Sequence, residues 1–197
     1  MTSTSESELE LTEIRFHGRG GQGTVVASQI LAAALFKEGK FVQAFPAFGV
    51  ERRGAPVAAF IRVSDRPILL RCEIYRPDHL VVLDPTLIYA IDVTSGLKEH
   101  GWIIINSDRP PESEEFDLPR EFRVATVDAN RIALAHHLGN PANPIVNTAI
   151  LGAFAKITGL VGLEPLLEAI REEVPLRREE NVAATLEAYE EARAGEH

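Results

Sequence analysis

Residues 13–37 read EIRFHGRGGQGTVVASQILAAALFK, and the order of residue types along this stretch decides the fold class. The first five residues alternate between polar and apolar, which predicts a strand. A loop with four glycines follows, and apolar residues then return at helical spacing as far as Lys37. A second short strand is predicted at 41–45, stopped by Pro46. Strand, glycine loop, crossover helix and strand form the opening of an α/β sheet.

The remaining segments continue this pattern, with one antiparallel element. Strand-like runs at 57–63 and 67–71 are separated by three residues, a spacing typical of a hairpin. We therefore expect one three-layer α/β/α domain with a mixed, mostly parallel sheet over residues 13–197, preceded by a disordered leader at 1–12. The other predicted strands are 79–84, 101–106 and 123–128, and the other predicted helices are 85–91, 129–138, 147–158, 163–174 and 178–194.

Composition is typical of a soluble globular protein. Of the 197 residues 45% are apolar and 25% are charged, which is enough for one core. No apolar run approaches the roughly 20 residues that span a bilayer, and the polar, acidic start is unlike a signal peptide. These features predict a cytoplasmic protein that contacts no membrane.

Cys72 is the only cysteine, which limits the redox and metal chemistry of the chain. One thiol excludes an intrachain disulfide, a Cys-ligated iron–sulfur cluster and a Cys-rich zinc site. Because Cys72 lies in an apolar run after Leu69 and Leu70, we expect it to fill space in the core. The six histidines show none of the spacings of metal-binding helices, so no metal site is predicted.

Charge is distributed unevenly along the chain. The net charge is −9, yet the stretch from Ile14 to Phe60 holds six basic residues against two acids, a local charge of +4. A basic segment within an acidic protein indicates a localised anion site and argues against a nucleic-acid surface.

Two interpretations of the glycine loop involve the loop alone, without the second motif at residues 52–54. Gly18, Gly20 and Gly23 have the spacing of a dinucleotide-binding loop. That fold also needs an acid at the end of the second strand, where residues 43–45 are Gln-Ala-Phe. Alternatively, the glycines serve only close packing of the backbone.

A third interpretation joins the loop to a second motif. The loop amides at the start of the helix can hold a phosphate, and Arg19 with the pair Arg52–Arg53 can bind it through guanidinium forks. One arginine of the pair can instead be tied to Glu51 in a salt bridge. Adjacent arginines usually point to opposite sides, so one can be structural while the other binds.

The chain shows no catalytic constellation. It has neither the Gly-x-Ser-x-Gly elbow of hydrolases nor the Lys-containing phosphate loop of NTPases. His136 and His137 are expected to be a partly exposed helical pair, and Asn147 a helix N-cap before a ligand contact. No catalytic residue is therefore assigned.

Several motifs in order carry a resemblance to a known family. IRFHGRGGQG at 14–23 is followed by QAFPAFGVERRGAP at 43–56, with further matches at 62–68, 106–107 and 147–153. The chain resembles the gamma subunit of 2-oxoacid:ferredoxin oxidoreductases, most closely the pyruvate (pyruvate synthase) branch. The resemblance extends over nearly the whole chain from about Glu13.

The resemblance implies a reaction carried out by a larger enzyme. That enzyme decarboxylates a 2-oxoacid on thiamine diphosphate with Mg²⁺, passes electrons through [4Fe–4S] clusters to ferredoxin, and transfers the acyl group to coenzyme A. It implies that these cofactors belong to alpha, beta and delta-type partner subunits, and that this chain helps bind coenzyme A without a catalytic centre of its own. The residues that the resemblance assigns to coenzyme A phosphates are Gly18, Arg19, Gly20, Gly21, Gln22, Gly23, Arg52, Arg53 and Gly54.

Alternatives remain for the role of the chain. It can be a purely architectural subunit of the same complex, whose glycine and arginine motifs serve folding and docking, or a gamma subunit of an enzyme acting on 2-ketoisovalerate or 2-oxoglutarate. A free-standing NAD enzyme is a further alternative. Because surfaces made for absent partners can pair with each other, the isolated chain can also form a homodimer.

Overall fold

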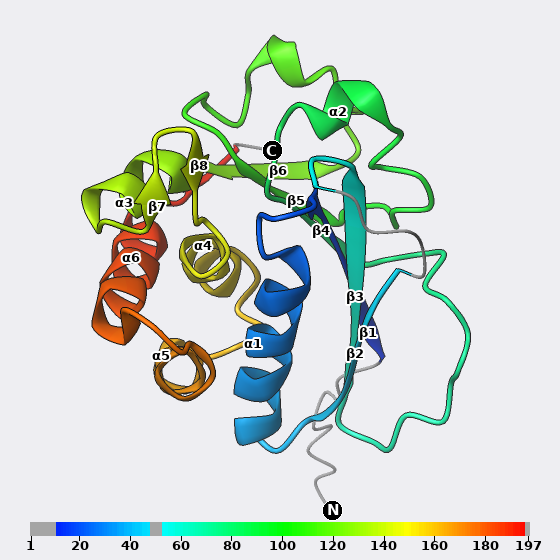
Figure 1. Ribbon diagram of the computed structural model, residues 1–197. Helices are drawn as coiled ribbons and strands as arrows, with labels where there is room; N and C mark the ends of the chain where they lie inside the picture. Colours follow the sequence, from blue (N-terminus) through cyan, green and yellow to red (C-terminus); the bar gives the residue numbers. More distant parts are fainter. Residues whose placement is uncertain (1–10, 48–52, 196–197) are drawn as a thin grey trace, which may run out of the picture.

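A seven-stranded mixed sheet organises the protein, as the computed structural model shows for residues 11–47 and 53–195 (Figure 1). The strand order is β2-β3-β1-β4-β5-β6-β9. Only β3 and β9 run against the other strands, which confirms the mixed, mostly parallel sheet. The strands are β1 Thr12–Arg19, β2 Phe41–Pro46, β3 Pro56–Ser64, β4 His79–Val82, β5 Trp102–Asn106, β6 Arg123–Val127 and β9 Arg193–Ala194.

Helices gather on one face of the sheet (Figure 1). Helices α1 and α4 pack on the strands, and α5 and α6 cover them from outside. The opposite face carries the four-residue helix α2, a short 3-10 turn and long connecting segments. The helical elements are α1 Thr24–Lys37, α2 Leu87–Ala90, α3 Ala129–Ala135, α4 Ala149–Thr158, α5 Leu163–Glu173, α6 Arg178–Glu191 and η1 Glu114–Phe116, and β7 Gly139–Asn140 with β8 Asn143–Pro144 forms a small separate hairpin.

The main core lies between the sheet and the helices. Ile14 and Phe16 of β1, Leu31 of α1 and Phe154 of α4 are fully buried there. Helix α1 is apolar around most of its circumference because the sheet covers one side and α5 covers another. The β1–loop–α1 unit predicted from the sequence is confirmed.

On the other face of the sheet, β1 and β3 bury polar side chains under the connecting segments, whereas β4 and β5 bury an apolar cluster with Phe116 and Phe122. Arg15 of β1 donates through Nη2 to the carbonyls of Val93 (2.7 Å) and Ser95 (2.8 Å). Arg62 of β3, only 1% exposed, forms an ion pair with Glu13 at 2.8 Å. The alternation that predicted β1 therefore separates an apolar face from a buried polar face.

The predicted hairpin between 57–63 and 67–71 is wrong. Strand β3 pairs with β1 and β2 instead, and residues 67–71 are irregular. Pro67 has no amide hydrogen for a ladder, and the carbonyls of Ile68 and Leu70 accept hydrogen bonds from the Gln43 side chain, both at 3.2 Å. The antiparallel element thus comes from the pairing of β3 with both β1 and β2.

The structure also bears on the expectations for Cys72, for the last predicted helix and for the leader. Cys72 is exposed and does not fill the core, because its segment lies on the surface of the connecting layer. Strand β9, within the predicted helix at 178–194, pairs with β6 after α6 has ended. Residues 1–10 of the expected leader lie outside the described part, whereas Thr12 already pairs with Val63. In the described ranges no helix is both long and apolar enough to cross a membrane.

Candidate functional site

The two sequence motifs meet at the carboxyl end of β1. The Gly20 amide donates to the carbonyl of Ala55 (2.9 Å), and the Gly54 amide donates to the carbonyl of Gly20 (3.0 Å). A parallel bridge also joins Gly20 and Arg53. Arg53 and Gly54 are exposed, and the predicted site residue Arg52 lies outside the described residues. The structure therefore brings together two loops that are more than 30 positions apart.

Glycines in the loop satisfy backbone and packing requirements. Gly21 (φ +98°) and Gly23 (φ +77°) occupy the left-handed region, where other residues are strained. A Cβ on Gly18 would lie 2.1 Å from Oγ1 of Thr24, and a Cβ on Gly23 would lie 2.7 Å from Nδ2 of Asn147. These three glycines are thus required by the fold before any ligand is considered.

Arg19 turns into the structure and fixes the loop. Its Nε forms an ion pair with Asp84 at 2.9 Å, and its Nη2 donates to Oγ1 of Thr86 at 2.8 Å. Its Nη1 donates to the carbonyl of Gly54 at 3.1 Å, which ties the second loop to the first. Because Asp84 compensates its charge, Arg19 positions the two loops and contributes little net positive field.

Gln22 completes the same network. Its Oε1 accepts a hydrogen bond from the Arg19 amide at 2.7 Å, and its Nε2 lies 3.4 Å from Asp84. Asp84 is the last residue of the strand predicted at 79–84, and no sequence motif joins it to the glycine loop. The feature that places Asp84 beside the loop is the parallel pairing of β1 with β4, because the carboxyl ends of parallel strands lie at the same edge of a sheet.

The start of α1 offers the hydrogen-bond donors of the site. The first-turn amides of a helix have no carbonyl partner within it, and the cap residue Gly23 provides no side chain to accept from them. A hollow of about 310 Å³ lies here, bordered by Arg19, Gly20, Gly21 and Thr24 among others. Oγ1 of Thr24 is buried and has no hydrogen-bond partner among the described residues. Amide donors and positive helix-dipole potential suit a small anion such as a phosphate group.

Asn147 lies beside the loop and does not cap a helix. Helix α4 begins at Ala149 after Thr148, and Oδ1 of Asn147 accepts from the Thr148 amide at 3.0 Å. Its amide nitrogen instead faces Gly23. The predicted N-cap role is therefore wrong, and Asn147 packs against the glycine loop.

Burial lowers the pKa of two of the described histidines. Burial, and then the charge of Arg15, lower the pKa of His17 to about 3, and burial lowers the pKa of His79 to about 4. His136 is half-buried and lies 2.6 Å from Glu187, whereas His137 is exposed beyond the end of α3, so the partly exposed pair is confirmed but only its first member adjoins the helix. Within the ranges that the structure describes, no group of three or more His, Cys, Asp or Glu side chains could hold a metal ion.

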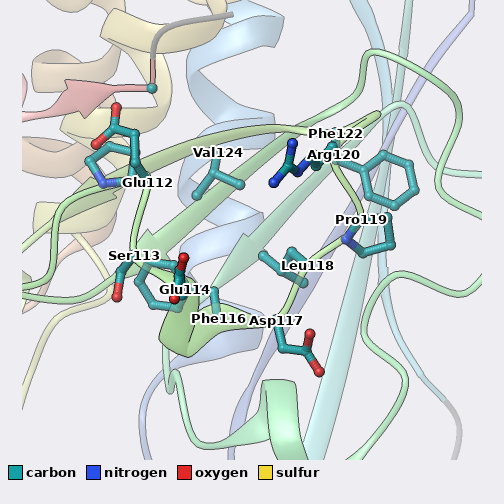
Figure 2. A pocket seen from close by; sticks show the side chains of 12 residues that line it. Glu112, Ser113, Glu114, Phe116, Asp117, Leu118, Pro119, Arg120, Phe122 and Val124 are labelled. Atoms are coloured by element: carbon teal, nitrogen blue, oxygen red, sulfur yellow. The ribbon is translucent and has the colours of Figure 1, made fainter.

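A larger hollow of about 800 Å³, which none of the loop residues lines, lies between the segment 111–122 and Val124 of β6 (Figure 2). Figure 2 shows the apolar side chains of Phe116, Leu118 and Phe122 and the carboxylates of Glu114 and Asp117 around it. It contains none of the site residues expected from the sequence. The candidate site therefore remains the pair of loops at the start of α1.

Comparisons with known proteins give a consistent result along the chain. Residues 13–191 match the family described as pyruvate ferredoxin/flavodoxin oxidoreductase. The chain is 55% identical over 181 residues to the pyruvate/ketoisovalerate oxidoreductases common subunit gamma of Thermococcus kodakarensis, with 91% of this chain and 96% of that protein covered. It is 50% identical over 181 residues to pyruvate synthase subunit PorC of Methanothermobacter marburgensis, with 91% of this chain and 97% of that protein covered.

A solved structure agrees with these relatives. The crystal structure of pyruvate oxidoreductase subunit PORC from Thermotoga maritima has a TM-score of 0.81 and 36% identity, and the match covers 95% of this chain and 99% of that chain. Family match, close relatives and fold coincide over almost the whole length. The chain belongs to the pyruvate ferredoxin/flavodoxin oxidoreductase family.

Proposed function

We propose that this chain is a gamma-type subunit of a multisubunit pyruvate or 2-oxoacid:ferredoxin oxidoreductase and that it binds coenzyme A without a catalytic centre of its own. The relatives that match it end to end are named as gamma or PorC subunits of such enzymes, which supports the subunit role. Thiamine diphosphate, Mg²⁺ and the [4Fe–4S] clusters would belong to alpha, beta and delta-type partners. A single cysteine is too few to ligate a cluster, which agrees with this division.

The bridge between Gly20 and Arg53 carries the proposal for coenzyme A. It brings the backbone of Arg53, an exposed residue, next to Gly20 in the glycine loop that precedes α1. Coenzyme A presents a diphosphate and a ribose phosphate, and arginine binds such groups through two parallel hydrogen bonds. In this arrangement the loop amides and Arg53 hold phosphate oxygens, while Arg19 and Asp84 keep the two loops at a fixed separation.

An architectural role is the second candidate, and specific contacts favour it. The glycines are explained by strain and packing, and the charge of Arg19 is compensated by Asp84. In this alternative the loops serve only to hold β1, α1 and the start of β3 in register. The two candidates differ in what the exposed Arg53 does, because only ligand binding needs its charge.

The choice of 2-oxoacid is proposed to lie with other subunits. The Thermococcus relative is named as common to pyruvate and ketoisovalerate oxidoreductases, so in that protein one gamma subunit serves both substrates. Pyruvate, 2-ketoisovalerate and 2-oxoglutarate are thus alternatives to be distinguished on the complete enzyme.

Steady-state kinetics of the assembled oxidoreductase tests the proposal. Arg53→Ala and Arg52→Ala should each raise the KM for coenzyme A, by about tenfold for the residue that contacts phosphate, with kcat retained at saturation. Arg120→Ala, an exposed arginine at the distant hollow, is the matched control and should leave the KM unchanged. Normal assembly with an unchanged KM in both variants would reject coenzyme A binding at this loop. Failed assembly would favour the architectural role.

A further inference from the structure

An exposed apolar strip runs along the segment between β3 and β4. In residues 67–76 the side chain of Leu69 is 88% exposed, that of Tyr75 is 69% exposed and that of Leu70 is 44% exposed. Arg71 and Arg76 are exposed between and beside them. Large apolar side chains gathered in one short segment are unusual on the free surface of a monomer and often mark an interaction site.

Contacts from the sheet hold this irregular segment in place. The Gln43 side chain donates to the carbonyls of Ile68 and Leu70, both at 3.2 Å. The buried Arg62 donates through Nη2 to the Glu73 carbonyl at 3.1 Å. Two sheet side chains thus direct their donors to the backbone of one surface segment.

Apolar and steric contacts fix the same segment farther along. Ile74 is only 3% exposed and anchors it from below. A Cβ on Gly96 would lie 2.0 Å from the Tyr75 carbonyl oxygen, so the backbone packs directly on that glycine. A segment anchored in this way presents Leu69 and Tyr75 in a set arrangement and loses little conformational entropy when it binds.

We propose that residues 67–76 are a docking surface for a partner subunit of the oxidoreductase, one that offers an apolar cleft bordered by carboxylates. Leucine and tyrosine side chains would fill the cleft, and arginine and tyrosine are the residues that most often dominate binding energy at interfaces. In a chain of net charge −9, Arg71 and Arg76 give this segment two positive groups against the single acid Glu73, which favours an acidic partner surface. The inference rests on the proposed function, because it requires an assembled enzyme.

Co-expression of the chain with its partner subunits tests the docking surface. The double variant Leu69→Asp/Tyr75→Ala should enter the purified complex at least tenfold less than the wild type at equal expression. Leu176→Asp, on a leucine that is 76% exposed between α5 and α6, is the matched control and should assemble normally. Because Leu69 and Tyr75 are exposed, the isolated double variant should keep the wild-type unfolding temperature.

Charge provides a second arm of the experiment. Arg71→Glu/Arg76→Glu should weaken assembly at low salt, because the new carboxylates repel an acidic partner surface. Added salt screens this repulsion, so it should strengthen assembly of the variant while it weakens assembly of the wild type. Assembly of both double variants at wild-type stoichiometry would overturn the proposal. So would a wild-type dimer of the isolated chain that Leu69→Asp dissociates without affecting the complex, since a second copy would then cover the surface.

Hydrogen exchange on the wild-type protein keeps the inference testable without any variant. The amides of residues 67–76 should exchange at least tenfold more slowly in the complex than in the isolated chain, and equal rates would contradict docking. This result is independent of coenzyme A. An Arg53→Ala enzyme that assembles with an unchanged KM would remove the proposed ligand role and leave the docking surface intact.

Discussion

At β1 and β3 the two faces of the sheet are buried by different kinds of interaction, whereas β4 and β5 carry buried apolar side chains on both faces. Under the helices, Ile14, Phe16 and Phe154 form an apolar core. Under the connecting segments, Arg15 and Arg62 are buried through hydrogen bonds to carbonyls and an ion pair. The apolar face derives its stability from packing, which depends little on pH, whereas the polar face depends on every partner being present.

The buried polar side chains also hold the connecting segments in place. Long connecting segments lie on the polar face, and the side chains of Arg15 and Arg62 bind their backbone carbonyls. A purely apolar face would leave those carbonyls without donors. The polar face of β1 and β3 thus lets irregular segments, including residues 67–76, keep a defined shape on the surface.

Truncation in the apolar core should have the largest effect on stability. Phe154→Ala removes a fully buried ring from α4 and should lower the free energy of unfolding by about 4 kcal/mol. Urea denaturation of the isolated chain measures this loss. A loss below about 1 kcal/mol would mean that the helical face is loosely packed, and the comparison of the two faces would fail.

Removing one partner of the buried ion pair should rank second. Arg62→Ala leaves Glu13 without its cation and should cost about 3 kcal/mol, less than the extreme for such pairs because the Glu13 side chain is 14% exposed. The double variant Glu13→Leu/Arg62→Met should recover at least half of this loss, as measured by the same denaturation. Equal losses in the single and double variants would show that packing, and not charge, decides this position.

The pH dependence of stability should show a smaller effect of the polar face. The pKa of His17 is about 3 in the folded chain because of burial and the nearby Arg15, against about 6.5 when unfolded. Between these values the unfolded chain binds a proton that the folded chain does not. The contribution of His17 is therefore complete above pH 6.5 and is lost as the pH falls toward 3.

His17→Gln isolates this contribution. The wild type should lose about 2 kcal/mol more stability than the variant between pH 7 and pH 5, measured by denaturation at each pH. The glutamine retains an acceptor for Nε of Arg15, which lies 3.0 Å from Nε2 of His17. Parallel pH profiles for the two proteins would mean that His17 titrates normally, and that its surroundings do not exclude charge.

Local patterns made much of the architecture predictable. Alternation at 13–17, glycines at 18–23 and helical spacing up to Lys37 gave the central β1–loop–α1 unit, because each signal depends on neighbouring residues. The pairing of β3 with β1 was not predictable in this way, since it joins residues 37 to 51 positions apart. Likewise, the surface position of Cys72 follows from a segment held by Gln43 and Arg62, which no local pattern indicates.

The candidate site was predictable in outline and not in detail. The sequence identified both loops, and the structure joins them through Gly20 and Arg53. It gave no indication that Arg19 would be paired with Asp84, a residue 65 positions away. Arg19 was expected to contact an anion, and in the structure its guanidinium contacts Asp84, Thr86 and the Gly54 carbonyl. Arg53 is exposed at the same place.

Direct binding of coenzyme A to the assembled enzyme tests the central claim, that the two joined loops form a phosphate site. Titration calorimetry without the 2-oxoacid separates binding from turnover. The charge reversal Arg53→Glu should weaken the affinity for coenzyme A at least tenfold while the complex stays assembled. An unchanged Kd in a normally assembled Arg53→Glu enzyme would contradict the account.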